Sequence, residues 1–190
     1  MRYSVVHKEQ IREKLLQSSG GLAKEQGFAA VGIDGFMSAI GLSGGAFYGH
    51  FSSKDELFSA IVERELGNSL RLLSTDGELD RPKLERCLKQ YLNMTHVANP
   101  HKGCVLPVLG AEIARADVAV REKAEYWLSR LQQAWAATMG CERLAWAALA
   151  QCIGALVVAR MLSSPPLQQQ VLDASYNLLV GQIDAHEGGE

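Results

Sequence analysis

Cysteine is scarce in this sequence of 190 residues, and long apolar runs are missing. Its four cysteines are widely spaced and form no C-x-x-C pair, a pattern that fits reduced thiols better than a disulfide framework. No run of 18 apolar residues occurs, and the first ten residues, MRYSVVHKEQ, lack the apolar core of a signal peptide. These absences predict a protein that stays in the cytoplasm.

The sequence also lacks an excess of positive charge. The net charge is −2, and residues 1–64 carry seven Lys or Arg against seven Asp or Glu. This balance argues against a strongly basic DNA-binding domain. Any attraction to phosphates must come from the placement of individual charges, from helix N-termini and from two copies acting together.

Motifs for catalysis and metal binding are missing as well. We find no nucleophile elbow, phosphate loop or paired metal ligands, so we expect no enzyme activity and no cofactor. The series His96, His101 and Cys104 does not have the spacing of a familiar zinc site, and we expect no metal there. Cys104 stays open as a redox-sensing thiol, because the neighbouring Lys102 would favour the reactive thiolate form.

What is present is helical periodicity, without strand alternation, in a chain that is 47% hydrophobic and 21% charged. We predict an all-α fold of about nine helices. A three-helix domain over residues 1–53 precedes a larger helical domain over residues 54–190. The expected helices of the larger domain are about 54–73, 82–98, 107–114, 117–138, 142–162 and 167–183.

The most informative stretch runs from Ile33 to Lys54, IDGFMSAIGLSGGAFYGHFSSK. An apolar face ends at Gly41, where a left-handed residue would cap the helix. Ser43 is placed to cap a second helix, in which Phe47 and Phe51 form one apolar stripe. The other side of that second helix is small or polar and has no core to enter. This pattern indicates a helix-turn-helix, whose second helix enters the DNA major groove.

The same stretch resembles the signature of the tetracycline repressor (TetR) family of bacterial regulators, G-[VL]-S-x-G-x-[FL]-Y-x-H-F-x-[SD]-K-x-x-L. The resemblance covers about residues 8–65. It implies a DNA-binding regulator, by default a repressor, that works as a homodimer and leaves a palindromic operator when a small-molecule inducer binds. The matching residues, in order, are Gly41, Leu42, Ser43, Gly45, Phe47, Tyr48, His50, Phe51, Lys54 and Leu57.

Carried onto this sequence, the family pattern places Tyr48, His50 and Lys54 near phosphates. The chain departs from the pattern at Gly44 and Gly49, where the family often has basic residues, and at Asp34. We therefore expect Ala46 to contact a thymine methyl and DNA shape to carry more of the specificity. The predicted DNA-binding residues are Ser43, Gly44, Gly45, Ala46, Tyr48, Gly49, His50 and Lys54.

An inducer pocket is implied between the helices of the larger domain. Pockets are mostly apolar with a few placed polar groups, although an aromatic stripe is more often plain core. The candidate lining residues are Tyr91, Thr95, His96, Cys104, Glu112, Trp127 and Trp135.

The helix over 142–162 is apolar nearly all round, so it is either an internal core helix or part of a dimer interface. We favour a four-helix bundle formed with the last helix and their two-fold copies, as the resemblance also implies. An all-helical ligand-binding or interaction protein without DNA binding stays as the alternative function, and a small helical enzyme is a weaker one. The predicted interface residues are Ala145, Ala148, Leu149, Cys152, Leu156, Leu172, Ser175 and Leu179.

Overall fold

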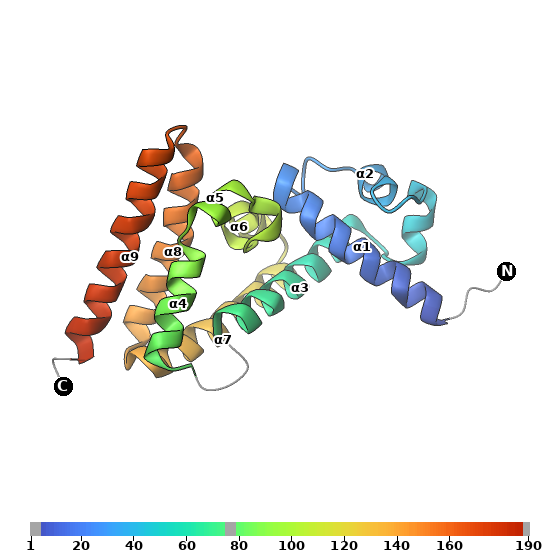
Figure 1. Cartoon of the computed structure of the whole chain (residues 1–190). Helices are drawn as coiled ribbons and strands as arrows, with labels where there is room; N and C mark the ends of the chain where they lie inside the picture. The colour runs from blue at the N-terminus through green and yellow to red at the C-terminus, as the bar shows by residue number, and fades with distance from the viewer. Residues whose placement is uncertain (1–4, 75–78, 188–190) are drawn as a thin grey trace.

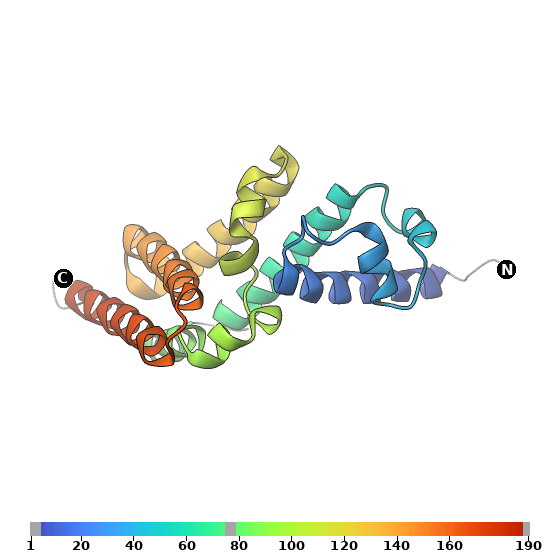
Figure 2. The same ribbon diagram turned by 90° about the horizontal axis from the view of Figure 1, so that it is seen from above.

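The computed structural model describes residues 5–74 and 79–187, and over these ranges the backbone is helical with no strand, as the periodicity predicted. The N-terminal helices gather at one end of the molecule, and the long C-terminal helices stand antiparallel at the other (Figures 1 and 2). The helices are α1 (Val5–Gln26), α2 (Ile33–Ser38), η1 (Gly44–Gly49), α3 (Lys54–Ser74), α4 (Arg81–Tyr91), α5 (Met94–Ala98), η2 (Pro100–Lys102), α6 (Leu106–Arg115), α7 (Val118–Met139), α8 (Glu142–Met161) and α9 (Pro165–Glu187).

The N-terminal helices enclose a small aromatic core. Phe28 stacks on Phe36 and on Phe58, with ring centroids 5.4 and 4.3 Å apart, so the α1–α2 loop is held to both α2 and α3. Gly27 and Gly41 have φ of 85° and 75°, the left-handed conformation that glycine adopts without strain, and each follows the end of a helical segment. We call α1, α2 and η1 the head.

Helix α3 connects the head to the rest of the chain, and it packs along α7. Leu57, Phe58 and Ile61 at its start belong to the core of the head. The same apolar cluster continues into α6 and α7 through Leu109 and Val120. The predicted division after residue 53 therefore falls within a continuous core, and the two predicted domains stay a prediction.

A second apolar cluster lies between α4, α7, α8 and α9. Asp117 caps α7 by accepting a hydrogen bond from Val120 N at 2.9 Å, and Gly140, with φ of 67°, ends it. Trp135 is almost fully buried, and its indole N–H donates to the carbonyl of Leu73 at 3.1 Å. This cluster fixes the wall against which the α4–η2 segment rests.

The residues predicted for the dimer interface lie inside this cluster, which corrects that prediction. Seven of the eight are buried within the single chain, and Ser175 is half-buried with its carbonyl accepting from Gln151 Nε2 at 3.0 Å. The small side chains of α8 bring α9 close within the chain. The buried seven are Ala145, Ala148, Leu149, Cys152, Leu156, Leu172 and Leu179.

The opposite face of α8 is apolar and exposed. Trp146, Val157, Val158 and Met161 recur at helical spacing along it, and Leu178 of α9 is exposed as well. Among the described helices, α8 is the one with the length and composition to cross a membrane, and 39% of its apolar window is buried in the fold. A core helix of a water-soluble protein meets the same criterion, so this resemblance to a membrane span is weak evidence.

Two predicted helices differ from the structure. The expected helix over 82–98 is interrupted at Leu92, because Asn93 accepts a hydrogen bond from His96 N at 2.8 Å and starts the separate helix α5. The second helix of the predicted helix-turn-helix is the 3₁₀ helix η1, and the side chain of Ser43 does not cap it. Three glycines in six residues explain the short element, since each disfavours an extended α-helix by about 1 kcal/mol relative to alanine.

Candidate nucleic-acid interface and ligand cavity

The inner side of η1 is anchored by aromatic side chains. Phe47 and Phe51 are buried with ring centroids 5.9 Å apart, and Phe47 meets Tyr48 edge-on at 5.4 Å. Tyr48 itself is 66% exposed and points away from that core. Gly45 and Gly49 have no heavy atom within 4 Å of an added Cβ, so their side of η1 is open. The structure thus presents a bare backbone surface beside one tyrosine.

Gly44 and Ala46 serve the fold more than the open surface. A Cβ on Gly44 would stand 1.8 Å from Asp34 Oδ1, so the glycine leaves room for a carboxylate carried by α2. Ala46 is half-buried and packs against the core of the head. Asp34 and Gly44, two departures from the usual family pattern, therefore depend on each other in space.

His50 follows η1 and is half-buried beside positive charge. Burial lowers the pKa of His50, and the nearby Lys8 and Arg12 of α1 lower it further. Its Nδ1 is enclosed and has no hydrogen-bond partner among the described residues. The imidazole is thus held neutral at pH 7, and an approaching phosphate would favour its protonation.

Lys54 has a structural contact in the free protein. Its ammonium donates to the carbonyl of Ala29 at 3.2 Å and lies 4.9 Å from the ring centre of Phe28. Ser53 caps α3 by accepting from Glu56 N at 3.0 Å. The carboxylate of Glu56 accepts hydrogen bonds from the backbone N–H and hydroxyl of Ser52, and these hydrogen bonds lower the pKa of Glu56.

Sequence reasoning missed two basic residues near this surface. Lys8 and Arg12 lie one turn apart on α1, and the guanidinium of Arg12 lies 4.6 Å from the ring centre of Phe51. A basic pair at i, i+4 on the first helix was the available signal, but the balanced charge of residues 1–64 concealed it. These two cations supply the local positive charge that the composition lacks.

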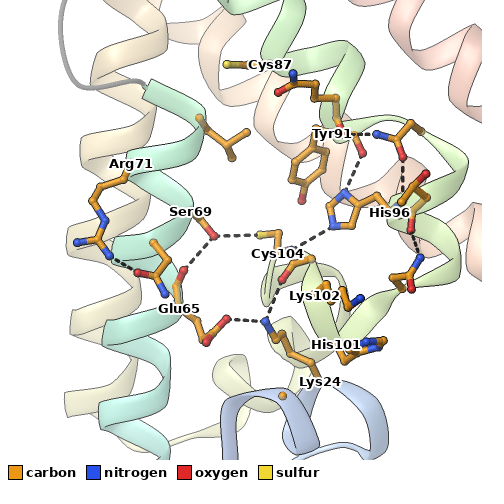
Figure 3. Close-up of a pocket in the computed structure, with 18 of the residues that line it drawn as sticks. Lys24, Glu65, Ser69, Arg71, Cys87, Tyr91, His96, His101, Lys102 and Cys104 are labelled. Carbon is orange, nitrogen blue, oxygen red and sulfur yellow. Dashed lines mark hydrogen bonds and ion pairs between the residues drawn. The ribbon is translucent and has the colours of Figure 1, made fainter. Parts of the chain in front are cut away.

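A cavity of about 850 Å³ opens between the head and the larger part of the chain. Its walls come from α1, α3, α4, α5 and η2, and Figure 3 shows α1 at its lower edge and α3 on one side. Of the seven predicted pocket residues, four line this cavity: Tyr91, Thr95, His96 and Cys104.

The other three predicted pocket residues lie elsewhere and have structural contacts. Glu112 of α6 accepts hydrogen bonds from the backbone N–H groups of Phe28 and Ala29 at 3.0 and 2.7 Å, which ties α6 to the head. Trp127 packs 3.4 Å from the position of a Cβ on Gly67. Trp135 is the buried indole described above. Glu112 thus holds α6 to the α1–α2 loop and does not line the cavity.

Hydrogen bonds order the cavity wall. His96 Nδ1 lies 2.8 Å from the carbonyl of Tyr91, and its Nε2 accepts from Cys104 N at 3.1 Å. The first contact requires Nδ1 to carry the proton, so the ring is neutral with a defined tautomer. Burial is the largest cause that lowers the pKa of His96, and Arg160 and Lys24 lower it further.

Lys24 connects the head to two other segments at the base of the cavity. Its Nζ lies 2.6 Å from Glu65 Oε2 on α3 and 3.1 Å from the carbonyl of Gly103 (Figure 3). Lys24 is 6% exposed, so this ion pair is shielded from solvent. Breaking a pair of this kind leaves an uncompensated charge and is costly.

The cysteines do not form a metal site or a disulfide within the described residues. None of the four cysteines is joined in a disulfide there, and no group of three or more His, Cys, Asp or Glu residues in the same ranges is placed to hold a metal. Burial raises the pKa of Cys152 to about 12 and also raises that of Cys87. Cys104 lies at the cavity, where Ser69 Oγ is 3.7 Å from its sulfur.

The fold and the exposed η1 surface define a helix-turn-helix protein with a helical companion region. Residues 15–61 match the family model of bacterial regulatory proteins, tetR family. This N-terminal segment, residues 15–61, thus belongs to the tetR family of bacterial regulatory proteins. The expected family is thereby confirmed, and it is a family of regulators, not enzymes.

Individual relatives agree with this assignment. The chain is 28% identical over 113 residues to the HTH-type transcriptional regulator YerO of Bacillus subtilis, a match that covers 58% of this chain and 39% of that protein. It thus aligns with less than half the length of that relative. The helical fold is shared with NemR of E. coli in its reduced form, with a TM-score of 0.74 and 19% identity over 88% of this chain and 94% of NemR. A TetR regulator from Chloroflexus aurantiacus gives a TM-score of 0.76 and 19% identity, with 93% and 96% covered.

Proposed function

We propose that this protein is a sequence-specific DNA-binding transcriptional regulator that represses from a palindromic operator as a homodimer and is released by a small-molecule ligand. The observation that carries the proposal is the open surface of η1, where Tyr48 stands exposed between two unobstructed glycines inside the segment that matches the family model. Backbone that can approach the groove floor and a hydroxyl that can reach a phosphate suit a DNA duplex.

Electrostatic support comes from three basic groups around η1. Lys8 and Arg12 lie close enough to His50 to affect its titration, and Lys54 begins the next helix. Together they place positive charge at the edge of the exposed η1 surface, although basic and acidic residues are equal in number over residues 1–64. The proposed phosphate contacts are therefore Tyr48, His50, Lys54, Lys8 and Arg12.

Dimerisation is proposed through the exposed face of α8 and α9. Gly154 and Gly181 have no heavy atom within 4 Å of an added Cβ, and this openness permits close approach of a second pair of helices. Two copies related by a dyad would present two heads, for which a palindrome is the natural target.

We propose that a ligand bound in the cavity causes release of DNA, because residues of both the head and the larger part of the chain line the cavity. Gln17, Gly21 and Lys24 belong to α1, whereas Tyr91 and His96 belong to the larger part. A ligand that changes the contacts of Lys24 would change how α1 rests on α3, and with it the spacing of two heads.

The decisive experiment is selection of bound DNA from a random pool by the purified protein. We expect recovery of a palindromic site. Recovery of no preferred sequence would contradict the proposal and favour a helical interaction protein without DNA binding. If an enriched site shows no dyad, the dimeric part of the proposal is wrong and the DNA-binding part stands.

Two variants then test the contacts on the selected site. Tyr48→Phe removes one hydroxyl, and we expect a loss of about 1 kcal/mol in binding free energy, roughly fivefold in affinity. Tyr126→Phe, at an exposed tyrosine of α7, should leave binding unchanged.

Lys8→Gln should weaken binding and reduce the slope of log affinity against log salt by about one. Lys14→Gln, on another side of α1, is the matched control. Unchanged affinity and slope in the Tyr48 and Lys8 variants would remove these assignments.

A further inference from the structure

The cavity at the joint is positively charged although the whole chain carries a net charge of −2. Four basic side chains line it, and Glu65 is its one acidic side chain among the described residues. The four basic residues are Lys24, Arg64, Arg71 and Lys102. Such an excess in a concave site attracts an anion, because the low-dielectric walls concentrate the field.

Two of these cations have no acidic partner among the described residues. Lys24 is paired with Glu65, and Arg64 is paired with Glu13 outside the cavity. Arg71 donates only to the neutral amide of Asn68, and Lys102 is exposed on η2 without an ion pair. Within the described part of the chain, the cavity thus keeps two cations that no carboxylate faces.

A half-buried cation behind the wall, Arg160, strengthens the same field. Arg160 of α8 donates from Nη2 to the carbonyl of His96 at 2.8 Å. Its Nε and Nη1 are buried and have no hydrogen-bond partner in the described ranges. Tyr91 and Cys104, which line the cavity, interact electrostatically with this guanidinium. Unsatisfied buried donors on a cation are costly, and a nearby negative charge would offset part of that cost.

The remaining lining is rich in neutral hydrogen-bonding groups. Side-chain amides and hydroxyls outnumber aliphatic side chains there, so a purely hydrocarbon ligand would leave polar groups desolvated. These groups are Gln17, Asn68, Ser69, Gln90, Asn93, Thr95 and Asn99.

We propose that the cavity binds a small organic carboxylate that carries further polar groups, with its charge facing Lys24, Arg71 and Lys102. This inference deepens the proposed function and rests on it for its regulatory meaning. A carboxylate near Lys24 competes with Glu65, which lies 2.6 Å from the lysine. Because Lys24 belongs to α1 and Glu65 to α3, binding weakens the ion pair that holds the head to α3.

Matched pairs of probes isolate the charge from the shape of the ligand. Gluconate is compared with gluconamide, and 4-hydroxyphenylacetate with 4-hydroxyphenylacetamide, by calorimetry on the full chain at low salt. We expect at least one carboxylate to bind ten times or more tightly than its amide, with an affinity that falls as salt is raised. If neither carboxylate binds more tightly than its amide, the inference is wrong.

Variants place the binding in this cavity. Lys102→Gln and Arg71→Gln each remove a charge without breaking an ion pair, and we expect each to weaken carboxylate binding at least threefold. Lys89→Gln, exposed on α4 and outside the lining, removes the same charge and should leave binding unchanged. Equal affinities in the Lys102, Arg71 and Lys89 variants would overturn the assignment to this cavity.

The selected DNA separates this inference from the proposed function. If carboxylates bind with the expected charge dependence but no DNA sequence is selected, the cavity assignment stands and the regulator proposal fails. If DNA is selected while the amides bind as well as the carboxylates, the cavity inference fails alone. When both hold, the bound carboxylate should lower affinity for the selected site in the wild type, and less so in Lys102→Gln.

Discussion

At the scale of single residues, Gly103 shows how tightly the cavity wall is built. A Cβ at this position would stand 2.2 Å from both Cδ2 and Nε2 of His96. The imidazole cannot turn aside freely, because hydrogen bonds to Tyr91 and Cys104 hold both of its nitrogens. The glycine is therefore required by a close approach.

We predict that Gly103→Ala lowers the free energy of unfolding by about 1–3 kcal/mol, as overpacking against a fixed ring does. The matched control is Gly110→Ala inside α6, where nothing lies within 4 Å of an added Cβ. That change should stabilise the protein by about 0.5–1 kcal/mol through helix propensity. Urea unfolding of the two variants measures both effects, and a stabilised Gly103→Ala protein would contradict the described position of His96.

His96 also makes stability depend on pH. Its pKa is lowered in the folded state, so the unfolded chain binds the proton more readily, with a pKa of about 6.5. The stabilisation is then present above pH 6.5 and is lost as the pH falls from there through the folded-state pKa. The groups facing the ring are Tyr91, Cys104, Arg160 and Lys24, and the last two oppose its protonation.

We expect His96→Gln to reduce the loss of stability between about pH 7 and pH 5, because the variant has no proton to bind. His101→Gln, at the same cavity, should keep the wild-type pH profile. The measurement is the free energy of unfolding in urea across this range. Parallel profiles for wild type and His96→Gln would show that the ring is not held as described.

At the scale of the element, sequence reasoning placed most helices within a few residues. The expected helix over 117–138 differs from α7 by one residue at each end, because its caps at Asp117 and Gly140 are local interactions. The break at Leu92 was missed, since the cap from Asn93 to His96 interrupts an apolar stripe that continues on both sides. Glu112 was assigned to the pocket because sequence does not show that its partners lie in the loop at Phe28 and Ala29.

Helix α8 shows the limit of pattern reading most clearly. Both of its sides are apolar, and periodicity does not show which side meets α9 in the same chain. Sequence reasoning chose the small residues around Ala148 for the dimer, whereas the structure buries them and exposes Trp146, Val158 and Met161. The choice of elements for the interface stays a prediction, and the face is corrected.

We predict that Val158→Glu makes the protein monomeric. Val158 is 46% exposed on α8, and a carboxylate there would meet its own copy near a two-fold axis. Val118→Glu, 59% exposed at the start of α7, is the control, because it adds the same charge away from this face. Sedimentation velocity should give a dimer for wild type and Val118→Glu. A dimeric Val158→Glu protein would place the interface elsewhere.

At the scale of the whole molecule, the head and the larger part share one apolar core. Leu57, Phe58 and Ile61 of α3 complete the head, and Ile113 of α6 and Val120 of α7 extend the same cluster. Polar contacts cross the joint as well, from Glu112 to the α1–α2 loop and from Lys24 to Glu65 and Gly103. A ligand bound between these two parts would act where the head is attached, as the proposed release from DNA requires.

This shared core predicts that the head does not fold by itself at the expected boundary. A fragment of residues 1–53 lacks the α3 side chains that cover Phe28 and Phe36, and loss of several buried side chains at about 2–5 kcal/mol each exceeds the stability of a small domain. We expect circular dichroism of this fragment to show little helix and no cooperative melting, whereas the full chain melts in one transition. Fragment 1–74, which restores α3, should gain helix over fragment 1–53. Cooperative unfolding of fragment 1–53 would instead support an independent domain that ends before α3.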